Sequence, residues 1–130
     1  FVYDPIVYVK TAFEDLPQDA FAEEIIHGRK MMRLKDADAW AAFSATIDKK
    51  TAEALMVTLT LEKEIIEDVV LHPVNRGFNS IIDATVHATR YNVNRDPFLK
   101  TQIDYHAGII RKCGGPRELE ALELLLQYIS

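Results

Sequence analysis

The sequence has 130 residues, of which 48% are hydrophobic, and its formal net charge is −5. This length and composition are typical of an ordinary globular domain with an apolar core. The acidic balance gives no basic face for general nucleic-acid binding, and no apolar run is long enough to span a membrane. The single cysteine, Cys113, excludes an internal disulfide and is typical of a reducing cytoplasm. Because the first residue is Phe1 rather than Met, we expect a processed or excised piece with an upstream segment outside this sequence.

The N-terminal stretch predicts two short helices. Asp4 is a good N-cap before a proline, and apolar residues then recur at helical spacing, so we expect a helix over Pro5–Leu16. Pro17 ends that helix. A second helix is expected over Gln18–His27, with Gly28 as its stop.

Strands are expected next in the chain. Gly28–Lys30 is a local basic spot, which is typical of a solvated loop. Residues 37–43 have helical composition, but alternating small and apolar residues favour a strand over Trp40–Ile47. Ala54–Leu61 is the clearest strand of the sequence. Glu62–Asp68 could continue it as a charged, partly exposed strand. Two or three strands do not readily form a stable sheet alone, so helices, an upstream segment or a second subunit must complete it.

The C-terminal half predicts a unit of three helices. Asn75 can cap a helix that runs to about Asn94, and Asp96 caps the next helix, which we expect over Pro97–Cys113. A pair of glycines ends that helix. Pro116 then opens a last helix with a strong leucine-rich face.

One polar stripe on the helix after Asn75 is the main candidate site. Its members are spaced four, three, four and three apart, which places them on one side of a helix: Arg76, Ser80, Asp83, His87 and Arg90. The partners of these charges could be water, another chain or an anionic ligand. Two arginines and the free N–H groups of a helix N-terminus suit a phosphate. Alternatively, Arg90 pairs with Asp83 or a neighbouring helix and Arg76 is solvated.

Other chemistry-bearing residues support weaker hypotheses. Asp83 and His87 could bind a metal, but the further ligands that zinc sites use are missing, so we expect no metal and instead a hydrogen bond that orients the histidine. Trp40 and Phe43 could stack on an aromatic ligand, although such residues are more often part of a core. Cys113 lies at the C-terminal end of a helix, where a thiol is not activated.

Several short motifs, taken in order, resemble a known family. They are Tyr3-Asp-Pro5, Leu34-Lys-Asp-Ala-Asp-Ala-Trp40, Asn75-Arg76 followed by Ile82-Asp-Ala-Thr-Val-His-Ala-Thr-Arg90, and Lys112-Cys-Gly-Gly115. Together they are similar to the family called domain of unknown function 447, whose members are FMN-binding proteins of the flavin-reductase-like split-barrel type with a helical C-terminal domain. The chain departs from the family pattern at Asp83, where the family has Glu, and at Cys113, where it often has Thr.

The resemblance implies an α+β fold: a partial split β-barrel, made of its last strands, packed with a C-terminal three-helix unit. Residues 1–71 would be the last part of the flavin-binding domain, with earlier barrel strands before Phe1, and residues 72–130 the helical domain. FMN is the expected cofactor, and Asn75, Arg76, Asp83, His87 and Arg90 are the expected cofactor-binding residues. A cytoplasmic homodimer is implied, because split-barrel flavoproteins usually build the flavin site between two subunits.

The function expected on this basis is FMN binding, as a flavin-dependent oxidoreductase or a flavin carrier linked to tetrahydromethanopterin-dependent one-carbon metabolism. In such proteins the flavin carries the redox chemistry while the protein holds and tunes it. The sequence offers no clear catalytic acid or base, so it leaves open whether the chain is an enzyme. Two alternatives stay open: a non-catalytic helical dimerisation or scaffold module, and a pterin-binding accessory protein.

Overall fold

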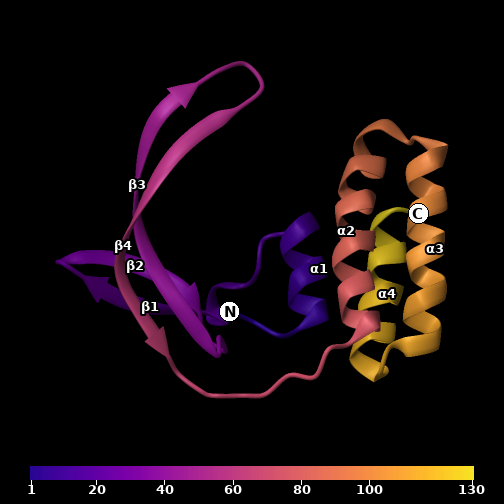
Figure 1. Cartoon of the computed structure of the whole chain (residues 1–130), viewed down its shortest axis with the longest axis horizontal. Helices are drawn as coiled ribbons and strands as arrows, with labels where there is room; N and C mark the ends of the chain where they lie inside the picture. The colour runs from indigo at the N-terminus through magenta and orange to yellow at the C-terminus, as the bar shows by residue number, and fades with distance from the viewer. The chain divides into compact units, whose positions relative to one another are not determined.

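The computed structural model describes all 130 residues and shows four α-helices and two small antiparallel sheets (Figure 1). The α+β class predicted from the sequence is therefore confirmed. The chain forms two compact units. One, the β unit, comprises Phe1–Tyr3 and Pro17–Leu71, and the other, the helical unit, comprises Asp4–Leu16 and His72–Ser130. None of the helices combines the length and the apolar character needed to cross a membrane.

The helical unit contains α1 (Pro5–Phe13), α2 (Arg76–Asn94), α3 (Pro97–Cys113) and α4 (Pro116–Tyr128). The expected three-helix unit is thus a four-helix unit, because α1 packs against α4 and α2 rather than with the strands. Helix α1 ends at Phe13, three residues before the predicted end at Leu16.

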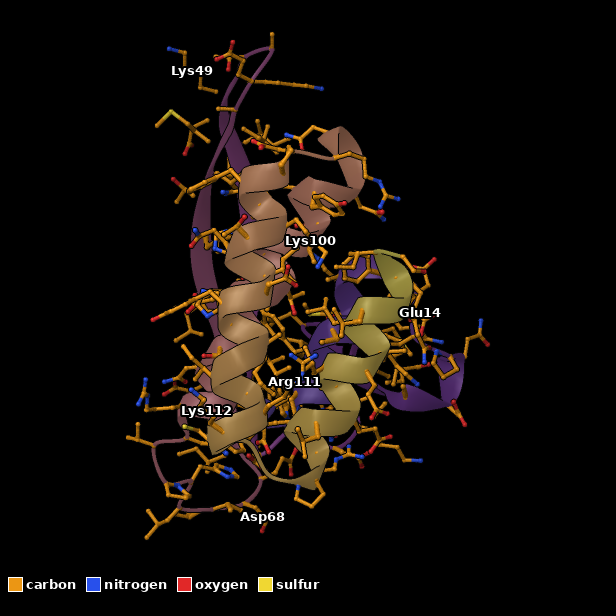
Figure 2. All side chains as sticks on the ribbon, turned by 90° about the vertical axis from the view of Figure 1, so that its right-hand side faces the viewer. Glu14, Lys49, Asp68, Lys100, Arg111 and Lys112 are labelled. Carbon is orange, nitrogen blue, oxygen red and sulfur yellow. The ribbon has the colours of Figure 1, made fainter.

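The predicted helix caps are formed. The side chain of Asp4 accepts a hydrogen bond from the Ile6 N–H at 2.8 Å, and Asp96 accepts one from the Phe98 N–H at 2.9 Å. Each aspartate stands before a proline at the first helical position, whose missing N–H costs nothing there. At the other end of α3, Arg111 and Lys112 occupy the last turn, where cations favour the helix dipole (Figure 2).

The core of the helical unit is aliphatic. Its largest fully buried side chains come from all four helices: Val9, Ile81, Ile103, Ile110 and Leu125. Each buried aliphatic side chain of this size stabilises a fold by roughly 1.5–3 kcal/mol through removal of apolar area from water. The core therefore holds the four helices in fixed register and positions the side chains that face outward from α2 and α3.

The first sheet of the β unit corrects a prediction. Phe21–Ile26 is not part of a helix: a short 3₁₀ turn over Gln18–Ala20 leads into strand β1, which pairs antiparallel with β2 (Arg29–Leu34). Apolar residues at helical spacing suggested the helix, but pairing with β2 decides the conformation. Gly28 belongs to the hairpin turn instead of ending a helix.

The second sheet confirms the other two strand predictions and lengthens them. β3 spans Ala39–Lys50 and pairs antiparallel with β4, which spans Leu55–Ile66. The register shifts twice, once at Ala42/Phe43 and once at Ile47/Lys49. The hairpin exposes large apolar side chains over much of its length, namely Phe43, Ile47, Leu55, Met56, Leu59, Leu61 and Ile66. The strands form two separate two-stranded sheets and no closed barrel.

Candidate functional site

The five polar residues of the predicted stripe lie on α2 but do not share one environment. Arg76, Asp83 and Arg90, which are seven residues apart, are exposed. Ser80 is buried, and His87 is half-buried. The stripe therefore consists of three charged side chains in solvent, with two neighbours that turn toward the inside of the helical unit.

The two arginines of α2 cannot hold one phosphate together. They are fourteen residues apart on a single helix, which at 1.5 Å per residue is about 21 Å of rise. Neither Arg76 nor Arg90 forms an ion pair within the chain, so the alternative in which Arg90 pairs with Asp83 is not observed either. A contact between one of these arginines and a ligand stays a prediction.

Asn75 links two helix N-termini. Its side-chain oxygen accepts hydrogen bonds from the N–H groups of Gly77 at 2.8 Å and Phe78 at 3.3 Å. Its side-chain nitrogen donates to Glu118 Oε1 at 3.1 Å, and Glu118 Oε2 accepts from the N–H of Gly115 at 2.8 Å. Two of the N–H groups expected to help hold an anion are therefore bonded to Asn75 itself. This geometry gives Asn75 a role in joining α2 to α4.

His87 faces another histidine rather than Asp83. The expected hydrogen bond between Asp83 and His87 is not formed, and the Nδ1 atoms of His87 and His106 are both buried without a partner. The two imidazole rings lie 5.8 Å apart between centroids with an interplanar angle of 29°, and Tyr105 packs edge-on against His106 at 5.3 Å. No sequence pattern predicts this pair, because only the packing of α2 on α3 brings His106 to His87.

No group of three or more His, Cys, Asp or Glu side chains in the chain is arranged to hold a metal ion.

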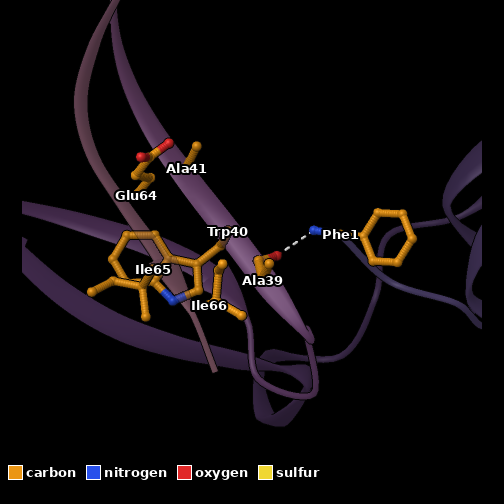
Figure 3. A pocket seen from close by; sticks show the side chains of 7 residues that line it. All are labelled: Phe1, Ala39, Trp40, Ala41, Glu64, Ile65 and Ile66. Atoms are coloured by element: carbon orange, nitrogen blue, oxygen red, sulfur yellow. Dashed lines mark hydrogen bonds between the residues drawn. The ribbon is translucent and has the colours of Figure 1, made fainter. Parts of the chain in front are cut away.

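A first cavity in the β unit lies beside Trp40 and has a volume of about 620 Å³. Figure 3 shows its lining residues, which come from β3, β4 and the start of the chain: Phe1, Ala39, Trp40, Ala41, Glu64, Ile65 and Ile66. The Trp40 indole N–H donates to Glu67 at 2.8 Å, and the cations of Arg33 and Lys63 lie 5.5 and 5.2 Å from its ring centroid. Trp40 is therefore a fixed aromatic wall, half-buried and not part of a closed core.

A second cavity, of about 250 Å³, lies where the β1–β2 turn meets the β3–β4 hairpin. Basic and hydroxyl side chains line it together with apolar ones: Ile26, His27, Arg29, Lys30, Met31, Phe43, Ser44 and Glu62. The stretch Gly28–Lys30, expected to be a solvated loop, is thus the end of the turn and the start of β2, and Arg29 and Lys30 line the cavity. A signal for it was present, since a two-residue turn ending in glycine between apolar segments is typical of a hairpin.

Two models of one protein family match the chain. A family model described as "Protein of unknown function (DUF447) N-terminal domain" matches residues 1–68. A second model, "Protein of unknown function (DUF447)", matches residues 75–127. The chain belongs to the DUF447 family. The resemblance inferred from its short motifs is therefore confirmed.

Among solved structures, this DUF447 chain is similar to the crystal structure of the FMN-bound protein MM1853 from Methanosarcina mazei, which belongs to the same family. The two share 32% sequence identity with a TM-score of 0.91. The match covers 98% of the present chain and 68% of the M. mazei chain. The fold seen here is thus that of most of an FMN-bound relative.

The histidine pair of the DUF447 chain predicts a pH dependence. Burial, the larger influence, and neighbouring His87 lower the pKa of His106, whereas Asp83 acts to raise it. Because the unfolded chain then takes up a proton at higher pH than the folded chain, the helical unit should lose stability as pH falls below about 6.5. We expect His106→Gln to reduce this loss and Asp83→Asn to increase it. Thermal unfolding at pH 7 and pH 5, with an NMR titration of the histidines, measures both effects; equal slopes in all three proteins would contradict the prediction.

Proposed function

We propose that this DUF447 chain binds FMN. The observation that carries the proposal is the FMN-bound relative, which is 32% identical and superposes on 98% of the chain. We also propose that the two hairpins of the β unit are part of a split β-barrel, as the resemblance to the flavin-reductase-like type implies. FMN supplies redox chemistry wherever it is bound, so the role proposed for the protein is that of a cytoplasmic flavin-dependent oxidoreductase or flavin carrier.

The residues present in the β unit fit such a cofactor. Ligand sites usually have volumes of about 300–1,000 Å³, with mostly apolar walls and a few polar groups that fix orientation. The cavity beside Trp40 is in this range at about 620 Å³, and its apolar residues outnumber its single acid. Its aromatic wall suits the flat ring system of a flavin. The chain's own contribution would be to bind the ring, orient it and exclude water from one side of it.

A homodimer is part of this proposal. The β3–β4 hairpin leaves Ile47, Leu59 and Leu61 from 50 to 62% exposed, and contiguous apolar surface of this kind marks an interaction site. A second copy could cover the hairpin and bring further residues to the flavin. The link to tetrahydromethanopterin-dependent metabolism rests only on the family resemblance.

An FMN titration followed by flavin fluorescence tests the proposal. We expect saturable binding, and sedimentation of the same samples reports the oligomeric state. The double variant Arg76→Ala, Arg90→Ala tests the polar side of α2, including the predicted contacts of Asp83 and His87 beside it. Because one phosphate cannot contact both arginines, and because neither lines the two cavities of the β unit, we expect the FMN dissociation constant of this variant to stay within about twofold of the parent value.

Other outcomes of the titration have definite meanings. Marked weakening in the double variant would place the flavin on α2 and support the cofactor-binding residues predicted from the sequence. A folded chain that binds no FMN would favour the scaffold module. A pterin that raises the melting temperature where FMN does not would favour the pterin-binding accessory protein, since a ligand of the native state stabilises it.

A further inference from the structure

The turn between β1 and β2 carries an imidazole at its first position. Ile26 pairs with Arg29, so the turn consists of only two residues, His27 and Gly28. Both have positive φ, 49° and 76°, as a type I′ hairpin turn requires. Asparagine is the favoured residue at the first position, because it tolerates the left-handed conformation better than larger side chains. His27, a residue type that also tolerates positive φ, therefore brings an imidazole to a position where asparagine is commoner.

A second irregularity of the backbone lies opposite His27. In the β3–β4 ladder, Ala42 pairs with Lys63 and Phe43 pairs with Leu61, so the register passes over Glu62. Such a bulge redirects a side chain, and bulges are over-represented beside active sites. The Glu62 carboxylate reaches His27 Nε2 at 3.3 Å. Both irregular positions contribute their side chains to the same 250 Å³ cavity.

The cavity also holds donors that the fold does not use. Lys30 is paired with Glu23 at 2.6 Å, and His27 with Glu62. In contrast, the Arg29 guanidinium and the Ser44 hydroxyl have no partner within the chain. A free guanidinium fork and a hydroxyl, with an imidazole nearby, are suited to the oxygens of a phosphate group. Ile26, Met31 and Phe43 form an apolar wall of the same cavity, and Phe43 lies three residues along β3 from Trp40, which lines the cavity proposed for the ring.

We propose that the cavity between the two hairpins is a binding site for a phosphate monoester, with Arg29, Ser44 and His27 as its donors. The Glu62 carboxylate, 3.3 Å from Nε2, orients the imidazole, and the Arg29 guanidinium supplies a positive charge. This deepens the proposed function and rests on it in one respect: the phosphate monoester is the phosphate end of FMN. A free phosphate would meet the same donors, so the experiment separates the two sources.

The test uses three variants of the whole chain. His27→Asn keeps a residue favoured in the turn and removes the imidazole, so it should fold at least as well as the parent. Arg29→Met removes the free guanidinium. Lys49→Met is the matched control, because it makes the same charge change at an exposed position on β3 outside the cavity. Each protein is titrated with FMN and with riboflavin, which lacks the phosphate, and with inorganic phosphate while the amide signals of residues 26–31 and 44 are followed by NMR.

We expect Arg29→Met to weaken FMN binding by about tenfold or more, since it removes a charge-assisted hydrogen bond, which is stronger than a neutral one. His27→Asn should weaken it as well, with no loss of melting temperature. Riboflavin binding should be the same in all variants, and Lys49→Met should resemble the parent. Inorganic phosphate should shift the cavity amides of the parent and not those of Arg29→Met.

Two results would overturn the site. One is FMN binding that is equally tight in Arg29→Met, His27→Asn and the parent; the other is phosphate that leaves the cavity amides unmoved while FMN binds elsewhere. Failure of the proposed function looks different, because the chain would then bind neither flavin while inorganic phosphate still shifts the cavity amides through Arg29. That last pattern would keep the phosphate site and remove FMN as its ligand.

Discussion

Replacing Gly77 by alanine is expected to destabilise the helical unit by about 3 kcal/mol, the upper part of the usual range for overpacking. A Cβ atom on Gly77 would lie 2.5 Å from the Cα of Gly114 and 2.8 Å from its nitrogen. Both are backbone atoms, so no side-chain rotation can relieve the clash, and the start of α2 would have to move away from the α3–α4 turn. The Asn75–Glu118 hydrogen bond across the same junction would be stretched.

Gly108 provides the control for this prediction. It lies inside α3, and a Cβ added there meets no atom within 4 Å. Gly108→Ala should therefore stabilise the chain by about 0.5–1 kcal/mol through the better helix propensity of alanine. Urea unfolding followed by circular dichroism at 222 nm, which reports on the helices, compares the two variants. Equal stability of Gly77→Ala and the parent would show that the helix junction is looser than the structure describes.

The helices were predictable because their signals are local. Asp4, Asn75 and Asp96 each cap a helix within three residues of themselves, and prolines and glycines mark the remaining ends. The membership of α1 in the helical unit was not predictable in this way. It depends on apolar contacts with α4, more than a hundred residues later in the sequence, which no local pattern encodes.

The β1–β2 hairpin was missed for a related reason. Phe21–Ile26 has two glutamates and apolar residues at helical spacing, and only pairing with Arg29–Leu34 selects the extended conformation. That error also hid the candidate phosphate site, because His27 and Arg29 reach one cavity only when His27 and Gly28 form a two-residue hairpin turn. Glu62 could not be placed there from sequence either, since its orientation depends on a register shift.

For the candidate site on α2, residue spacing predicted the side of the helix correctly but not the distances or the neighbours of its side chains. Spacings of three and four residues correctly placed Arg76, Asp83 and Arg90 on one side of the helix. The same spacing does not indicate how far apart residues lie along the helix axis. The two arginines are separated by about 21 Å in that direction. It also does not indicate which residue of a neighbouring helix each side chain contacts. In the structure His87 contacts His106 and not Asp83.

Replacing Glu118 by alanine is expected to lower the free energy of unfolding by about 2–4 kcal/mol. Glu118 is only 7% exposed, and its two oxygens accept hydrogen bonds from Asn75 Nδ2 and from the N–H of Gly115. Alanine would leave both donors without a partner at the junction of α2 and α4, where water reaches them poorly. The carboxylate at the start of α4 would also be lost, where the helix dipole favours it.

Glu120 is the matched control, since it is one turn or less away on α4 but exposed, with a 3.6 Å ion pair to Arg117. Glu120→Ala should change the unfolding free energy by less than about 0.5 kcal/mol.

A double-mutant cycle of Glu118→Ala with Asn75→Ala isolates the hydrogen bond between α2 and α4. We expect the double variant to be less destabilised than the sum of the two single variants, because either change alone breaks the same hydrogen bond. Additive effects would mean that Asn75 acts only as a cap. FMN affinity measured on the same variants separates a structural role of Asn75 from a role in binding. A loss of stability without a loss of affinity would mean that Asn75 only stabilises the fold. Weakened binding in a fully folded Asn75→Ala would mean that Asn75 contacts the flavin, as predicted from the sequence.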